Sequence, residues 1–235
     1  PESEDSRVIL YLHGGGYLFG SARTHRVMLA HMARAAKARV LALDYRLAPE
    51  IPFPAPVEDS VSAYRWLLAE GISAKKMVIG GDSAGGGLAV AALVALRAVG
   101  EPMPAAGVCI SAWTDMESTG QSHTTNAESD PSVSKERLLK IAKVYLDGKE
   151  PTAPLASPIH ADLTGLPPLL LQVGSIEVLL DDSTLLKSRA KAAGVSVEME
   201  VWDDMPHVWH HYAPILPEAR KAIGRIGEFV LEHTP

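Results

Sequence analysis

The sequence predicts an α/β protein, in which a mostly parallel sheet carries helices on both faces. Short apolar runs of the kind found in buried strands alternate along the chain with longer segments of helical pattern, and repeated strand–helix units favour a parallel sheet. With 235 residues, 47% of them apolar, the chain is long enough to form one domain, residues 1–235, with a substantial core.

The apolar pattern places the expected elements in order. Buried strands are expected over 8–12, 40–43, 77–79, 105–110 and 168–173, and the alternating run 195–202 is expected to be an edge strand. Helices are expected over 24–38, 57–70, 88–97, 135–146, 181–193 and 218–232. Thr24 is predicted to cap the first helix, and Val27 and Trp66 are predicted to face the core.

Two stretches interrupt this alternation. The loop after the second strand carries Asp44, Arg46 and Glu50, which we expect to form a buried ion-pair network. The segment 116–161 is polar, contains several prolines and holds a single expected helix. An insertion of this length above the strand ends is predicted to be a cap or lid.

Composition excludes several classes of function. A net charge of −6 without any basic run argues against a nucleic-acid partner. No apolar stretch approaches the roughly 20 residues of a membrane span, and the acidic opening, residues 1–6, does not resemble a signal peptide. Cys109, the single cysteine, lies in an apolar run and is expected to be a core residue. These features predict a cytoplasmic protein.

The first candidate site is the turn Gly81-Asp-Ser-Ala-Gly85, which fits the pattern G-x-S-x-G between a strand and a helix. A serine on so tight a turn sits in strained backbone, and the flanking glycines avoid clashes. Ser83 is therefore the predicted nucleophile. The Ala84 N–H, at the start of the following helix, is predicted to receive negative charge.

A second glycine-rich loop, His13-Gly-Gly-Gly16, directly follows the first strand. Its backbone can bend sharply and expose N–H groups. Paired with the Ser83 turn, Gly14 and Gly15 are predicted to supply the rest of an oxyanion hole. His13 is interpreted as a residue that fixes the loop.

A serine nucleophile needs a base and an orienting carboxylate. His207 is the preferred base because it follows the last strand in a turn, with His210 and His211 as rivals one turn later. Glu177 follows a strand end and is the preferred acid, with Asp181 as the alternative.

The chain order Ser83, Glu177, His207 is that of α/β-hydrolases. The sequence resembles the hormone-sensitive-lipase-like (family IV) esterases of that superfamily. The matching motifs are His13-Gly-Gly-Gly16, Asp44-Tyr-Arg-Leu-Ala-Pro-Glu50, Gly81-Asp-Ser-Ala-Gly-Gly86, Gly174-Ser-Ile-Glu177 and Met205-Pro-His207.

The resemblance implies an α/β-hydrolase fold and a carboxylic ester hydrolase that prefers short- to medium-chain acyl esters. It implies no cofactor and no metal, with Ser83 as nucleophile, His207 as base and an oxyanion hole from Gly14, Gly15 and Ala84. It also implies a homodimer through the edge strand 195–202.

The sequence departs from the family in two places. Glu177-Val178 stands where the family usually has Asp-Pro, and only twelve residues precede His13 where the family has a longer cap segment. The cap is therefore expected to lack its N-terminal part.

The same machinery could cleave amides, thioesters or lactones. A non-catalytic small-ligand receptor is the alternative from another class, although such receptors commonly lose the histidine or the acid.

Overall fold

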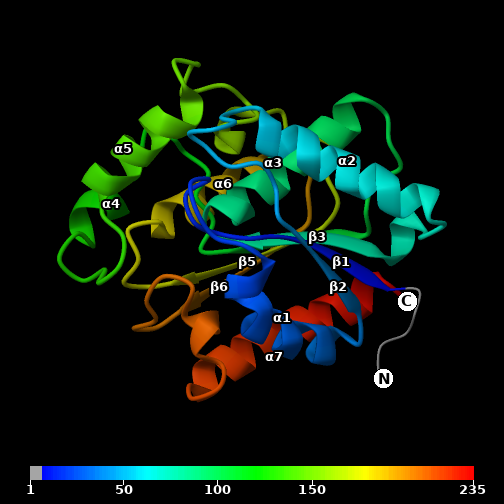
Figure 1. The fold of residues 1–235 in the computed structure, drawn as a ribbon. Coiled ribbons are helices and arrows are strands. Elements are labelled where there is room, and N and C mark those ends of the chain that lie inside the picture. The colour runs from blue at the N-terminus through cyan, green and yellow to red at the C-terminus, as the bar shows by residue number, and fades with distance from the viewer. Residues whose placement is uncertain (1–6) are drawn as a thin grey trace.

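The computed structural model describes residues 7–235, and a six-stranded sheet forms its centre (Figure 1). In sheet order the strands are β2 (Arg39–Leu43), β1 (Val8–Leu12), β3 (Met77–Asp82), β4 (Ala106–Ile110), β5 (Leu169–Gly174) and β6 (Val197–Trp202). Every neighbouring pair is parallel, so the carboxyl ends of the strands meet at one edge of the sheet. The predicted parallel sheet and the edge position of β6 are confirmed. The prediction that the chain has no signal peptide concerns residues 1–6, which lie outside the described residues.

Helices cover both faces of the sheet, as predicted. On one face lie α1 (Ala22–Ala36) and α7 (Pro217–His233), and on the other lie α2 (Ala55–Ala69), α3 (Ala84–Ala98) and α6 (Leu180–Ala192) (Figure 1). Successive strand residues point to opposite faces. In β1, Ile9 and Tyr11 pack under α1 and α7, whereas Leu10 and Leu12 pack under α2 and α3. Because both faces are covered, the strand is apolar along its whole length.

Two details of the helices differ from the predictions: the residue that caps α1, and the exposure of two apolar side chains. Ser21, not Thr24, caps α1: the Ser21 side chain accepts from the Thr24 N–H, and the Thr24 hydroxyl accepts from the Ser21 N–H. Val27 is 46% exposed and Trp66 is 52% exposed, so their predicted core positions are wrong. The buried face of α1 is formed instead by His25, Met28, Leu29, Met32 and Ala36.

The predicted ion-pair network in the loop after β2 is also wrong. Arg46 pairs with Asp59 and Glu58 of α2, at 2.8 and 3.1 Å, and its side chain is 42% exposed. The Asp44 carboxylate instead accepts a hydrogen bond from the Ala22 N–H at 2.6 Å, at the start of α1.

The segment 116–161, which we call the cap segment, lies beside the carboxyl ends of the strands (Figure 1). It contains α4 (Ser122–Thr125), α5 (Lys135–Leu146), with the limits that the sequence predicts, and the 3₁₀ helix η2 (Pro158–His160). Two further 3₁₀ helices, η1 (Ala74–Lys76) and η3 (Trp209–Tyr212), precede β3 and α7. The cap segment is joined to the loop after β1 by the stacked rings of Tyr145 and Tyr17, whose centroids are 3.7 Å apart.

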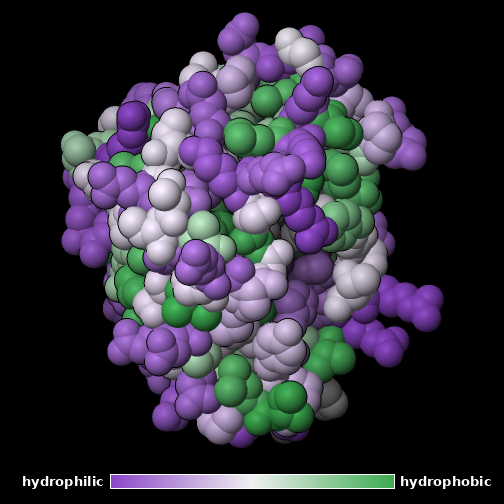
Figure 2. Space-filling model, turned by 90° about the vertical axis from the view of Figure 1, so that its left-hand side faces the viewer, coloured by the Kyte–Doolittle hydropathy of each residue, from purple (hydrophilic) through white to green (hydrophobic). Residues whose placement is uncertain are grey.

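Figure 2 shows the face that carries α4 and α5, where apolar side chains lie in separate groups among hydrophilic ones. Across residues 7–235, none of the helices combines the length and the apolar character that crossing a membrane requires.

Candidate active site

The turn at Ser83 joins β3 to α3 at the carboxyl edge of the sheet. Ser83 has φ 55° and ψ −124°. Residues other than glycine rarely adopt a backbone conformation with positive φ. Its N–H donates to Ile110 O at 2.8 Å, and its carbonyl accepts from Trp113 N at 2.9 Å. Hydrogen bonds to the neighbouring strand end therefore hold the strained turn in place.

The glycines of the motif are required by close packing. A Cβ on Gly81 would lie 2.2 Å from Gly85 O, and a Cβ on Gly85 would lie 2.0 Å from Leu12 O. Both neighbours are backbone atoms, so no side-chain movement would relieve the clash. The sequence-based reason for these glycines, steric closeness at the turn, agrees with this geometry.

His207 and Glu177 form a hydrogen-bonded pair beside this turn. His207 Nδ1 lies 2.8 Å from Glu177 Oε2, and the Glu177 side chain is fully buried. The other oxygen, Oε1, accepts from the Ser111 hydroxyl at 2.7 Å and from the Gly174 N–H at 2.6 Å. The carboxylate is thus fixed on both oxygens. Asp181, the alternative acid, is engaged elsewhere and accepts from the Ser122 N–H at 2.8 Å.

Electrostatics tune the basicity of His207. Burial by itself lowers the pKa of an imidazole. The hydrogen bond to Glu177 and the charges of Glu177, Asp130 and Asp82 together outweigh burial, so the pKa of His207 is raised above its ordinary 6.5. Because Nδ1 is held by the carboxylate, Nε2 is the nitrogen that remains for proton transfer.

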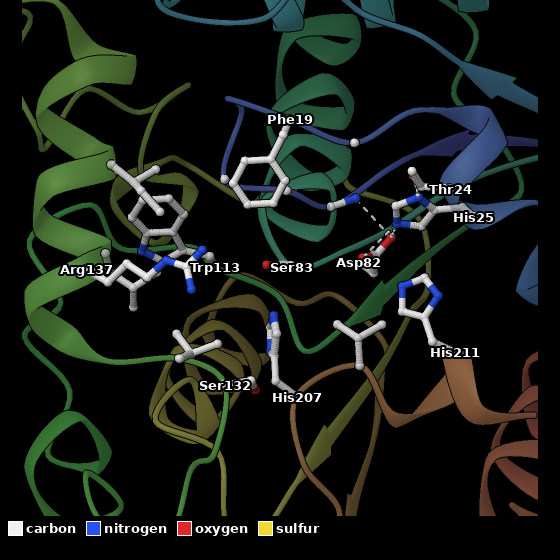
Figure 3. Close-up of a pocket in the computed structure, with 18 residues that line it drawn as sticks. Phe19, Thr24, His25, Asp82, Ser83, Trp113, Ser132, Arg137, His207 and His211 are labelled. Carbon is white, nitrogen blue, oxygen red and sulfur yellow. Dashed lines mark hydrogen bonds and ion pairs between the residues drawn. The ribbon is translucent and has the colours of Figure 1, made fainter.

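Ser83 and His207 line one cavity of about 540 Å³. Figure 3 shows the His207 ring pointing toward Ser83 from below, with Phe19 and Trp113 on the opposite side. Most of the remaining wall is apolar and includes Val133, Leu138 and Ile141, contributed by the cap segment. The volume lies within the roughly 300–1,000 Å³ typical of small-molecule sites.

The backbone N–H groups around Ser83 differ from the predicted set at one position. The Gly14 N–H donates to Asp82 Oδ1 at 3.0 Å, so it is not available to an oxyanion, and its predicted role is corrected. Within residues 7–235, the N–H groups of Gly15 and Gly16 donate to no acceptor, and both glycines line the cavity. The Ala84 N–H begins α3 and has no carbonyl to receive it within the helix.

Asp82 organises a buried network that the sequence did not reveal. Besides the Gly14 N–H, its carboxylate accepts from the Tyr11 hydroxyl at 2.9 Å, and Oδ2 lies 3.3 Å from His25 Nε2. Burial alone would raise the pKa of Asp82, but the hydrogen bond and charge of His25 lower it to about 2. Two features of the sequence could have indicated this network: a charged residue at the end of a buried strand, and a histidine on the inner face of a helix.

The other histidines have different surroundings. His13 stacks on Tyr45 with centroids 4.3 Å apart, and its Nδ1 lies 2.8 Å from Gly14 O. His210 is buried against Gln172, and burial lowers the pKa of His210 to about 3. His211 lines the cavity but does not contact Glu177, so neither rival occupies the position of His207.

Among the described residues, two groups have ligand atoms close enough to hold a metal ion. One comprises His25, Asp82 and His211, and the other comprises Asp115, Glu117 and His160. In the second group the Asp115 carboxylate already accepts from two backbone N–H groups and the Thr119 hydroxyl.

Comparison with known proteins places this geometry in a family. A family model described as "alpha/beta hydrolase fold" matches residues 9–211. An acetyl-hydrolase of Streptomyces hygroscopicus is 53% identical over 230 residues, which cover 98% of this chain and 77% of that protein. An esterase of Acinetobacter venetianus is 36% identical, over 97% of this chain and 76% of its own length.

Solved structures agree with these relatives. An esterase from the bacterial hormone-sensitive lipase family superposes with a TM-score of 0.99 at 68% identity, over 100% of this chain and 79% of that chain. The esterase EstE5, in crystals soaked with p-nitrophenyl butyrate, gives a TM-score of 0.97 at 54% identity, over 99% of this chain and 79% of its own.

Proposed function

The chain belongs to the α/β-hydrolase family, in its hormone-sensitive-lipase-like group, and from that premise we propose how its residues hydrolyse carboxylic esters. The protein is an ester hydrolase that acts on small-molecule esters. We assign the reaction to Ser83, His207 and Glu177. The observation that carries this assignment is the shared cavity of Ser83 and His207, with Nδ1 of His207 held 2.8 Å from the buried Glu177 carboxylate.

The reaction proceeds through an acyl-enzyme. His207 Nε2 takes the hydroxyl proton as Ser83 Oγ attacks the ester carbonyl, and the resulting imidazolium returns that proton to the leaving alcohol. A water molecule, deprotonated by His207, then attacks the acyl carbonyl, and the imidazolium gives its proton to Ser83 Oγ as the acid leaves. Glu177 holds the tautomer with hydrogen on Nδ1 and stabilises the imidazolium that forms in each step.

The oxyanion is stabilised by backbone N–H groups of Gly15, Gly16 and Ala84. This set replaces Gly14 by Gly16 because the Gly14 N–H is bound to Asp82. Removing one such donor typically lowers the rate about 10²–10³-fold.

The acyl group lies against the apolar wall of the cavity. Leu138 and Ile141 of α5 and Trp113 after β4 bound this wall, which favours short- to medium-chain acyl groups. The cap segment thereby contributes to substrate choice, and movement of α5 would change the room available for the acyl chain.

The test is hydrolysis of p-nitrophenyl esters from acetate to dodecanoate by the wild type and by Ser83→Ala. Activity that peaks at short chains and disappears in the variant is the expected result. Wild-type inactivity combined with stoichiometric organophosphate labelling of Ser83 would mean a competent nucleophile with an altered pocket. A Ser83→Ala variant with near-normal turnover would refute the assignment.

The outer edge of β6 could pair with its copy in a homodimer. Among the described strands β6 pairs with β5 alone, and Val201 on it is 48% exposed. Light scattering of the wild type and of Val201→Lys tests this contact, with a dimer-to-monomer shift expected in the variant.

A further inference from the structure

Three side chains that take no part in the proton transfer meet on the cavity wall beside Ser83. They are His25 from α1, Asp82 from the end of β3 and His211 from η3, and one ligand atom of each lies within 4.8 Å of the others. Figure 3 shows the two imidazole rings beside the Asp82 carboxylate, with the His25 ring above the His211 ring. All three residues line the cavity, so an ion from solvent can reach them.

The orientation of His25 is fixed by its other nitrogen. Nδ1 lies 3.1 Å from Ser21 O and 2.9 Å from the Thr24 hydroxyl, which itself donates to that carbonyl. Nδ1 is therefore the donor, and Nε2 faces both oxygens of the Asp82 carboxylate, 3.2 Å from Oδ1 and 3.3 Å from Oδ2. In the neutral ring Nε2 carries a lone pair, which can take either a proton, as in the ion pair with Asp82, or a metal ion. A backbone carbonyl on the far nitrogen is the usual support of a metal-binding histidine.

Asp82 is held just as firmly. Tyr11 and Gly14 both donate to Oδ1, and neither of them binds Oδ2. Of the three side chains, that of His211 is the least constrained. The residue is exposed, and its ring contacts the His25 ring edge-on with centroids 4.8 Å apart. Within residues 7–235 the ring itself makes no hydrogen bond, whereas the backbone N–H donates to Val208 O at 3.1 Å. A rotation of this ring can close the remaining distance.

We propose that His25, Asp82 and His211 form a binding site for one Zn²⁺ ion. Two imidazole nitrogens and one carboxylate oxygen are a donor set that suits Zn²⁺, with Zn–N and Zn–O distances near 2.0–2.2 Å and a fourth position open to water. In this chain the fourth position faces the cavity.

The bound ion inhibits ester hydrolysis. It draws charge from the carboxylate that holds the Gly14 N–H and so disturbs the loop that carries Gly15 and Gly16. It also narrows the cavity on the side of Ser83. This consequence rests on the proposed function, whereas the binding of the ion does not.

Binding is measured by calorimetric titration of the metal-free 235-residue chain with Zn²⁺, and by the visible absorption of bound Co²⁺. One ion per chain is expected. His211→Ala removes an exposed ligand and is expected to weaken Zn²⁺ binding by at least about tenfold. The matched control is His160→Ala, from the group with Asp115 and Glu117, which leaves the affinity unchanged. Thermal unfolding verifies that both variants are folded.

Equal Zn²⁺ affinity in the wild type and His211→Ala, absence of binding, or loss of binding in His160→Ala would each overturn the proposal. In the kinetic arm, Zn²⁺ slows the wild type and chelation with EDTA restores its rate. The Zn²⁺ concentration that halves the rate rises at least about tenfold in His211→Ala, measured against that variant's own metal-free rate. Unaltered inhibition in this variant would assign the effect to His207 instead. If the metal-free chain hydrolyses no ester, the proposed function fails while the titration still decides the metal site.

Discussion

Replacing Glu177 by glutamine tests the hydrogen-bond network around the base most directly. Glu177 Oε1 accepts from the Gly174 N–H, which can only donate, and from the Ser111 hydroxyl. A glutamine side chain must therefore keep its carbonyl oxygen at the Oε1 position and turn its NH₂ group toward His207 Nδ1. Two donors would then face one another, so His207 adopts the other tautomer, with hydrogen on Nε2.

In that tautomer Nε2 cannot accept the Ser83 proton, and no carboxylate stabilises the imidazolium. The loss expected for such a change is about 10³–10⁴-fold in kcat, or about 4 to 5 kcal/mol of transition-state stabilisation. Glu177→Asp keeps an acceptor for Nδ1 and is expected to lose less activity than Glu177→Gln.

The assay is kcat and KM on p-nitrophenyl butyrate, with circular dichroism and thermal unfolding to verify the fold. The matched control is Asp181→Asn, because Asp181 lies near in sequence but binds Ser122 rather than His207; its kcat is expected to stay close to that of the wild type. A Glu177→Gln variant with kcat within tenfold of the wild type would refute the tautomer argument.

Three further predictions follow from the same geometry. Because His207 must be neutral to act as a base and its pKa is raised, kcat/KM falls as pH drops through a midpoint above 6.5; a pH profile measures this, and Glu177→Gln moves the midpoint down. Gly85→Ala places a Cβ 2.0 Å from Leu12 O, which lowers the free energy of unfolding by at least about 1–3 kcal/mol and removes most of the activity. In Gly224→Ala the new Cβ meets no atom within 4 Å, and the free energy of unfolding rises by about 0.5–1 kcal/mol. Denaturant unfolding compares the two variants, and equal effects would contradict the close-packing argument. Ile141→Ala enlarges the acyl wall and shifts the preferred chain length upward, with about tenfold gain for the longer ester relative to butyrate; an unchanged chain-length profile would remove α5 from substrate choice.

Features that depend on neighbouring residues were predictable from the sequence. The strands, α5 and the tight turn at Ser83 follow from local apolar patterns and glycine spacing, and each is found close to its expected limits. Position after a strand end also selected Glu177 and His207, which the fold brings to hydrogen-bond distance across 30 residues of chain.

Features that depend on distant partners were not predictable in the same way. Arg46 had acidic residues on both sides in its own loop, yet it pairs with Asp59 because α2 begins beside it. Similarly, nothing near Gly14 indicates that its N–H is occupied, since the acceptor is Asp82, 68 residues further along the chain. Exposed apolar residues such as Trp66 lie in a helical pattern that does not distinguish a core position from a solvent-facing one.

The position of the proposed oxyanion donors follows from the pairing of two adjacent strands. β1 and β3 are neighbours in register, with Leu12 opposite Gly81, so the loop after β1 and the turn after β3 leave the sheet side by side. Asp82 then joins them, because its carboxylate belongs to the turn and binds the Gly14 N–H of the loop. Gly85 packs directly against the end of β1, where only a residue without a side chain fits. The distance between the nucleophile and the N–H groups of Gly15 and Gly16 is therefore set by backbone contacts and one buried carboxylate. A change at Asp82 would move these donors even though Asp82 itself transfers no proton.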